Sequence, residues 1–127
     1  MKISQKLKFF VCSLILAMLA LRAYLSLFPS KNLYIFGYNV HHLFIGAFLI
    51  VITLMLFIFD IINKFTIILA GISSALVLDE IIYLIATDGS DASYLTPVSL
   101  WGAIFLTGII LIFAIILYSM QKHKSKQ

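Results

Sequence analysis

Cysteine and charge are both scarce in this sequence, and each scarcity excludes a class of protein. Cys12 is the single cysteine among 127 residues, so the chain can form no internal disulfide and no relay between paired thiols. This excludes the quinone-linked disulfide oxidoreductases, which are also small helical membrane proteins. Only 11% of the residues are charged and 63% are hydrophobic, and a soluble domain this short could not bury so much apolar surface. We therefore expect an integral membrane protein whose surface is covered by the lipid bilayer.

Four apolar segments each approach the ~20 residues that cross a hydrocarbon core. They cover about residues 9–28, 41–59, 65–86 and 97–120. Pro29 ends the first segment, and Thr96-Pro97 is a favourable start for the fourth, with a hydroxyl at the cap and proline at the first helical position. The link over residues 60–64 is short, which favours an antiparallel hairpin of the second and third segments. The sequence predicts an all-α fold in which residues 1–127 form one domain, an integral membrane four-helix antiparallel bundle.

The lysines outside these segments set the expected orientation. Seven of the eight lie before the first span, between the second and third, and after the fourth, which is one side of the membrane: Lys2, Lys6, Lys8, Lys64, Lys122, Lys124 and Lys126. Only Lys31 falls in an outer loop. The positive-inside rule makes that side the cytoplasm. We expect a multi-pass plasma-membrane protein with cytoplasmic N- and C-termini. Charges placed by topology do not form a phosphate-binding surface, so no nucleic-acid partner is expected.

An alternative treats residues 1–23 as a cleaved signal peptide, because a basic start precedes an apolar stretch. Arg22 and the lack of a small-x-small cleavage site argue against it. After such a cleavage the remaining three spans would keep the same orientation.

In this topology the ionisable residues of the spans share the outer half of the membrane. Arg22 lies ~9 Å before the outer end of the first span, the histidine pair opens the second, and Asp79-Glu80 lies near the outer end of the third. A charge near the centre of a span costs at least ~2.5–3.5 kcal/mol, so such groups usually face a partner or a wet cavity. We expect these side chains to line an outward-facing polar pocket: Arg22, His41, His42, Asp79, Glu80 and Tyr83.

Helical spacing separates the two carboxylates. Tyr83 follows Asp79 by four residues and shares its face, whereas Glu80 points about 100° away. Two imidazoles and two carboxylates suit zinc or another divalent metal, which makes His41, His42, Asp79 and Glu80 the candidate ligands, although Arg22 nearby opposes a cation. The same groups could act as general acid and base, or Arg22 could simply pair with either carboxylate. The cofactor remains open.

Aromatic residues cluster at the outer boundary of the predicted spans. Tyrosine and tryptophan are typical of the membrane interface, so an aromatic belt is the expected role. The same side chains could line the mouth of a site for a lipid or another amphiphile. They are Tyr24, Tyr34, Tyr38, Tyr83, Tyr94 and Trp101.

Two segments carry a resemblance. Residues 38–46 read YNVHHLFIG and residues 71–80 read GISSALVLDE. With a His-His-Leu…Gly entry to one span and a small-residue span ending in Leu-Asp-Glu, the chain resembles an uncharacterised family of small bacterial and archaeal multi-span membrane proteins. The resemblance covers about residues 38–101 and leaves the first span outside. It implies a shared polar site without an activity, and serine and alanine at residues 73–75 replace glycine, which concerns packing.

Four functions remain open at this point. The first is the binding of a metal, a lipid headgroup or a small ligand. A hydrolase or transferase is the second, although the chain has no Gly-x-Ser-Gly, His-Glu-x-x-His or Gly-x-Gly-Asp signature. A small transporter is the third, but four-span exporters carry their carboxylate in the first span and need balanced loop charges. An accessory subunit, or a homo-oligomer whose polar pair contacts a neighbour's span, is the fourth. Whether the protein is an enzyme stays open.

Overall fold

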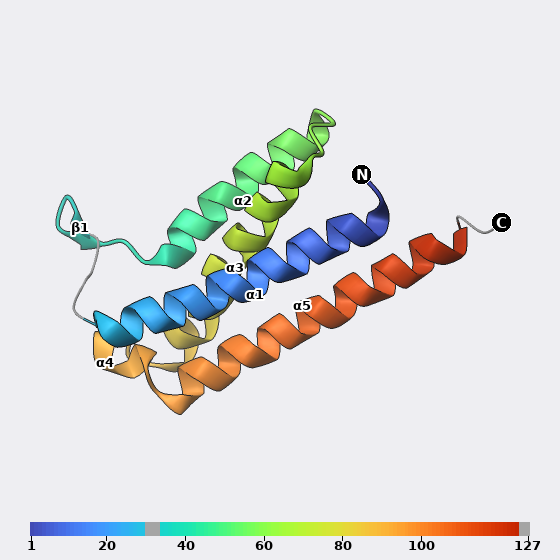
Figure 1. Cartoon of the computed structure of the whole chain (residues 1–127). Helices are drawn as coiled ribbons and strands as arrows, with labels where there is room; N and C mark the ends of the chain where they lie inside the picture. Colours follow the sequence, from blue (N-terminus) through green and yellow to red (C-terminus); the bar gives the residue numbers. More distant parts are fainter. Residues whose placement is uncertain (30–33, 125–127) are drawn as a thin grey trace.

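The computed structural model describes residues 1–29 and 34–124. Four long helices dominate it, together with one short helix and a two-stranded antiparallel hairpin between the first two helices (Figure 1). The elements are α1 (Ile3–Leu27), β1 (Tyr34–Ile35), β2 (Tyr38–Asn39), α2 (His42–Ile58), α3 (Lys64–Ala86), α4 (Asp91–Tyr94) and α5 (Pro97–Lys124). The predicted all-α class is confirmed. Pro97 opens α5 as predicted, whereas the Thr96 hydroxyl donates to the Ser93 carbonyl oxygen at 2.6 Å.

Within the described residues, three helices are long and apolar enough to cross a membrane: α1, α3 and α5. Helix α2 is apolar but has only 17 residues. The predicted boundaries lie close to those observed, except that α1 begins at Ile3 rather than near Phe9. Lysine and glutamine are good helix formers, so the polar start continues the helix. The fourth span remains a prediction.

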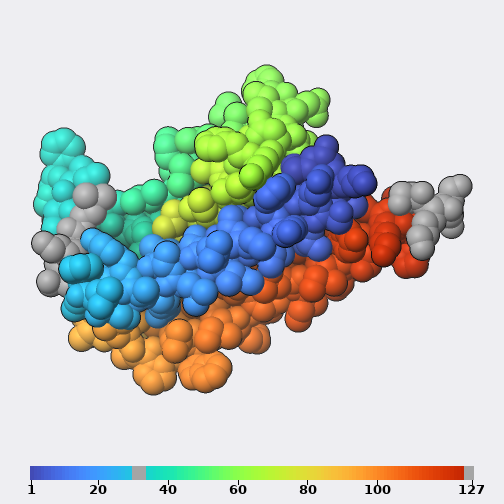
Figure 2. Space-filling model, viewed as in Figure 1, coloured from blue at the N-terminus to red at the C-terminus, as the bar shows by residue number. Residues whose placement is uncertain are grey.

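Helix α3 is the centre of the fold. It packs against α1, α2 and α5, and α1 also contacts α5, whereas α2 packs chiefly on α3. In the most apolar stretch of α3, 44% of the residues are buried inside the protein, compared with 11% in α1 and 6% in α5. The other long helices therefore pack on α3, and Figures 1 and 2 show α1 and α5 running beside one another. The integral membrane four-helix antiparallel bundle remains a prediction. The outer helices expose large apolar side chains such as Leu16 and Phe105.

Glycines permit the close approach of the helices. A Cβ on Gly71 of α3 would lie 2.6 Å from the Phe10 carbonyl oxygen of α1, and one on Gly46 of α2 would lie 2.8 Å from the Ser73 carbonyl oxygen of α3. These distances are shorter than a carbon–oxygen contact allows. The pairing of Gly46 with Ser73, and of the start of α2 with the end of α3, makes α2 and α3 antiparallel, as the short link predicts.

Gly71→Ala is expected to lower the free energy of unfolding by ~1–3 kcal/mol, because the methyl group would push α1 from α3. Gly108→Ala is the matched control, since nothing lies within 4 Å of a Cβ at Gly108. It should raise stability by up to ~1 kcal/mol through helix propensity alone. Unfolding in mixed micelles measures both variants. Equal effects of the two substitutions would contradict the proposed contact.

Candidate functional site

Arg22 ties three helices together near the ends opposite the termini. Its Nε donates to Asp79 Oδ1 of α3 at 2.5 Å, and its Nη2 donates to Ser99 Oγ of α5 at 3.1 Å. Its Nη1 donates to the Tyr94 carbonyl oxygen at 3.1 Å. The sequence left open which carboxylate pairs with Arg22, and the structure assigns that role to Asp79.

Asp79 is fully buried and accepts hydrogen bonds from three side chains. Besides Arg22, the donors to it are the Tyr94 hydroxyl and His42, whose Nε2 lies 3.1 Å from Oδ2. The Arg22 guanidinium carbon also lies 4.3 Å from the centroid of the Tyr94 ring, a cation–π contact. A buried charge is tolerated where it is both paired and hydrogen-bonded, and Asp79 meets both conditions.

Glu80 points away from Asp79 and holds the start of α2. Its Oε1 lies 2.7 Å from His41 Nδ1, and its Oε2 accepts from the Leu43 backbone N–H at 2.7 Å. His41 is the N-cap of α2 but makes no side-chain cap hydrogen bond. The carboxylate of the neighbouring helix therefore satisfies an orphan N–H at the positive end of the α2 dipole.

His42 lies between the two carboxylates. Its Nε2 faces Asp79 Oδ2, and its Nδ1 lies 3.5 Å from Glu80 Oε2. His42 is therefore the side chain through which the Arg22–Asp79 pair connects to Glu80.

Tyr83 lies beside this network rather than within it. Its hydroxyl donates to the carbonyl oxygens of Gly89 at 2.6 Å and Ser90 at 3.2 Å, in the turn after α3. Its ring lies 5.3 Å from that of Tyr94 and 6.0 Å from that of His41, between centroids. Five of the six predicted site residues therefore form one network, and Tyr83 packs next to it.

Tyr94 and Ser99 also belong to the network, although neither is among the predicted site residues. Tyr94 was expected in an exposed aromatic belt, but it is 6% exposed and its hydroxyl reaches Asp79. One feature of the sequence favours a buried Tyr94: it lies between a polar turn and Pro97, where the chain turns back toward the helix ends.

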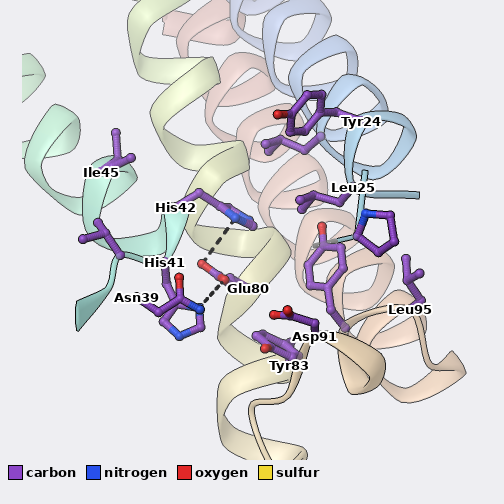
Figure 3. Close-up of a pocket in the computed structure, with 14 residues that line it drawn as sticks. Tyr24, Leu25, Asn39, His41, His42, Ile45, Glu80, Tyr83, Asp91 and Leu95 are labelled. Atoms are coloured by element: carbon purple, nitrogen blue, oxygen red, sulfur yellow. Dashed lines mark hydrogen bonds and ion pairs between the residues drawn. The ribbon is translucent and has the colours of Figure 1, made fainter. Parts of the chain in front are cut away.

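An open pocket of about 180 Å³ adjoins the network. Figure 3 shows α2 on one side of it and α1 on the other, with side chains of α3 between them. His41, His42 and Glu80 both line the pocket and belong to the ionic network. The labelled lining residues are Tyr24, Leu25, Asn39, His41, His42, Ile45, Glu80, Tyr83, Asp91 and Leu95.

A metal centre receives no support from this geometry. Across residues 1–29 and 34–124, no three His, Cys, Asp or Glu side chains are grouped to hold a metal ion. The carboxylate oxygens of Asp79 and Glu80 already accept hydrogen bonds from protein donors. The ligand set His41, His42, Asp79 and Glu80 stays a prediction from sequence.

The Tyr94 phenol should stay protonated in the folded protein at alkaline pH. Burial, and then the nearby Asp79 carboxylate, raise the pKa of Tyr94. A folded pKa above the unfolded value of ~10 gives stability that is fully present below pH ~10 and is lost as the pH rises further. Unfolding between pH 9 and 11 should therefore show a steeper loss in wild type than in Tyr94→Phe. Parallel pH profiles would contradict this burial.

Comparison of the chain with protein-family models, with curated proteins and with solved structures gives no match. The resemblance over residues 38–101 thus stays a prediction. The fold and site define a helical protein with three candidate membrane-spanning helices in the part of the chain that is described, and its function has to be argued from the site.

Proposed function

We propose that this is a multi-pass integral membrane protein that binds a small ligand in the pocket at the helix ends opposite its termini. One observation carries the proposal: His41, His42 and Glu80 line the pocket while belonging to a buried ionic network. The Arg22–Asp79 pair alone would suffice to join α1 and α3. A second carboxylate and two imidazoles facing a hollow exceed that structural need, and ionisable groups gathered at a pocket are typical of binding sites.

The proposed topology counts α2 as the fourth span. At 1.5 Å per residue its 17 residues measure ~26 Å, near the lower limit for a hydrocarbon core of ~30 Å. Four spans place every lysine of the sequence except Lys31 on the side of the termini, which is the cytoplasmic side under the positive-inside rule. The pocket then opens toward the outer face of the plasma membrane.

Unfolding of the purified protein with small probes of each charge class tests the binding proposal. The probes are tetramethylammonium, acetate, phosphate and zinc. One class should stabilise wild type saturably, by ~2.7 kcal/mol at one hundred times its Kd. Glu80→Gln should change this effect because the carboxylate charge is removed at nearly constant volume: a cation should stabilise the variant less than wild type, and an anion should stabilise it more.

Thr107→Val is the matched control for that test. Its buried hydroxyl has no hydrogen-bond partner among the described residues, and Thr107 does not line the pocket. The variant should bind as wild type does. Stabilisation by none of the four classes, or equal stabilisation of Glu80→Gln, would leave the network with a structural role alone.

Proton-linked transport is a second candidate, favoured by the position of His42. The two ring nitrogens of His42 face different carboxylates: Nδ1 faces Glu80 at the pocket, and Nε2 faces the buried Asp79. Proton uptake into vesicles that requires His42 and increases with a transported solute would support transport. Binding without such uptake would favour the first proposal.

A further inference from the structure

A second hollow, of about 460 Å³, lies between α1 and α3 and is almost wholly apolar. Phe9, Cys12 and Leu16 of α1 line it, together with Ile68 and Ile72 of α3. In a membrane-spanning protein such a hollow faces hydrocarbon, so an alkyl chain is the occupant that its walls match.

The two hollows follow one another along a single face of α1. Ser13, Ala17, Ala20 and Tyr24 are spaced by four, three and four residues, which places them on one helical face. The first three line the apolar hollow, and Tyr24 lines the polar pocket. From Phe9 to Ala20 the apolar hollow is ~16 Å long, close to half of a ~30 Å hydrocarbon core and thus to the reach of one acyl chain.

The polar pocket has the chemistry of a cation site. Three tyrosines line it, and its two acidic lining residues are Glu80 and Asp91. His41 and His42 also line it, both beside Glu80, and the described lining includes no lysine or arginine. Aromatic faces attract ammonium groups, most strongly where water is excluded. Arg22 is not part of this lining. Its guanidinium donates to Asp79 and Ser99 and already occupies a face of the Tyr94 ring, which leaves Tyr24 and Tyr83 as the rings for an added ammonium group.

We propose that the site takes a single-chain amphiphile with an ammonium headgroup, the headgroup among the tyrosines and Glu80 and the chain in the hollow along α1. The inference rests on the proposed function, because it names the ligand class of the same pocket. It adds a requirement that the pocket alone does not impose, namely that the ligand carries an alkyl chain.

The alkylation rate of Cys12 measures whether the apolar hollow is occupied. Cys12 is the single cysteine, is exposed and lines this hollow. Wild-type protein in nanodiscs of zwitterionic lipid is alkylated with N-ethylmaleimide, with and without tetradecyltrimethylammonium. At ten times its Kd the amphiphile should slow alkylation ~10-fold, because about a tenth of the hollows stay open. Tetradecyl sulfate at the same concentration should not slow it.

The double variant Cys12→Ser/Leu19→Cys is the matched control. Leu19 is 62% exposed on α1 and does not line the hollow, so alkylation at this position should not respond to the amphiphile. Ala20→Leu, which places a larger side chain in the hollow, should remove the protection of Cys12 while tetramethylammonium still stabilises the protein.

The outcomes separate this inference from the proposed function. Equal protection of Cys12 by tetradecyl sulfate would overturn the ammonium headgroup. Absence of protection, with tetramethylammonium still stabilising wild type but not Glu80→Gln, would overturn the alkyl chain and leave small-ligand binding intact. Absence of both protection and stabilisation by any small probe would overturn both proposals.

Discussion

Replacing Asp79 by leucine is expected to lower the free energy of unfolding by ~3–5 kcal/mol, because it leaves a buried guanidinium without its counter-charge. Asp79 is fully buried and accepts from Arg22, His42 and the Tyr94 hydroxyl. All three donors would lose their acceptor at once. Unfolding in mixed micelles measures the loss. Asp60→Asn, at an exposed residue between α2 and α3, is the control and should change stability by no more than ~0.5 kcal/mol.

A double-mutant cycle shows whether the loss comes from the unpaired charge. Arg22→Met in the Asp79→Leu background removes the guanidinium and restores an apolar contact between α1 and α3. The double variant should be more stable than Asp79→Leu by several kcal/mol, since a buried ion pair can often be exchanged for apolar side chains at little cost. Additive losses from the two substitutions would show that Arg22 and Asp79 act independently, against the geometry described above.

The position of the polar residues along the spans could be predicted from the sequence. Apolar length fixes where each span begins and ends, so the distance of a residue from a span end gives its level in the membrane. This argument placed Arg22, His41 and Asp79 at one level, where the structure brings them into one network. The divergence of Asp79 and Glu80 also follows from helical spacing, since one faces α1 and the other faces α2.

Which of these side chains pair with one another could not be predicted, because the pairs join segments that are far apart in the chain. Arg22 pairs with Asp79, whereas the two carboxylate oxygens of Glu80 contact His41 and the Leu43 N–H at the start of α2. Both histidines reach Glu80 because His41 precedes the helix with an extended backbone, so the 100° spacing of adjacent helical residues does not apply to it. Tyr94 joins the network only because α4 returns the chain to the helix ends.

The arrangement of the helices was also beyond the sequence pattern. Four apolar segments of similar length predict a bundle but do not say which helix the others share. Close approach at Gly46 and Gly71 instead makes α3 the common partner of α1 and α2. The space that this leaves between α1 and α2 is what the polar pocket occupies (Figure 3). The packing of α1 and α2 on α3 therefore also creates the candidate site.

Glu80→Ala is expected to release the first turn of α2 and to lower the free energy of unfolding by ~2–3 kcal/mol, the range for hydrogen bonds to a charged group. The Leu43 N–H donates to Glu80 Oε2 and lies in the first turn of the helix, where backbone donors lack intrahelical acceptors. Hydrogen exchange at the Leu43 amide should therefore accelerate strongly in Glu80→Ala.

Glu80→Gln separates this structural role from the role in binding. The glutamine carbonyl can still accept from Leu43 but carries no charge for His41, so exchange at Leu43 should fall between wild type and Glu80→Ala. If the pocket recognises a cation, Glu80→Gln should lose binding while most of the α2 start remains protected. Unchanged exchange at Leu43 in Glu80→Ala would show that α2 holds its first turn without α3. His41 and His42 would then be positioned by the packing of α2 on α3 and not by the Glu80 carboxylate.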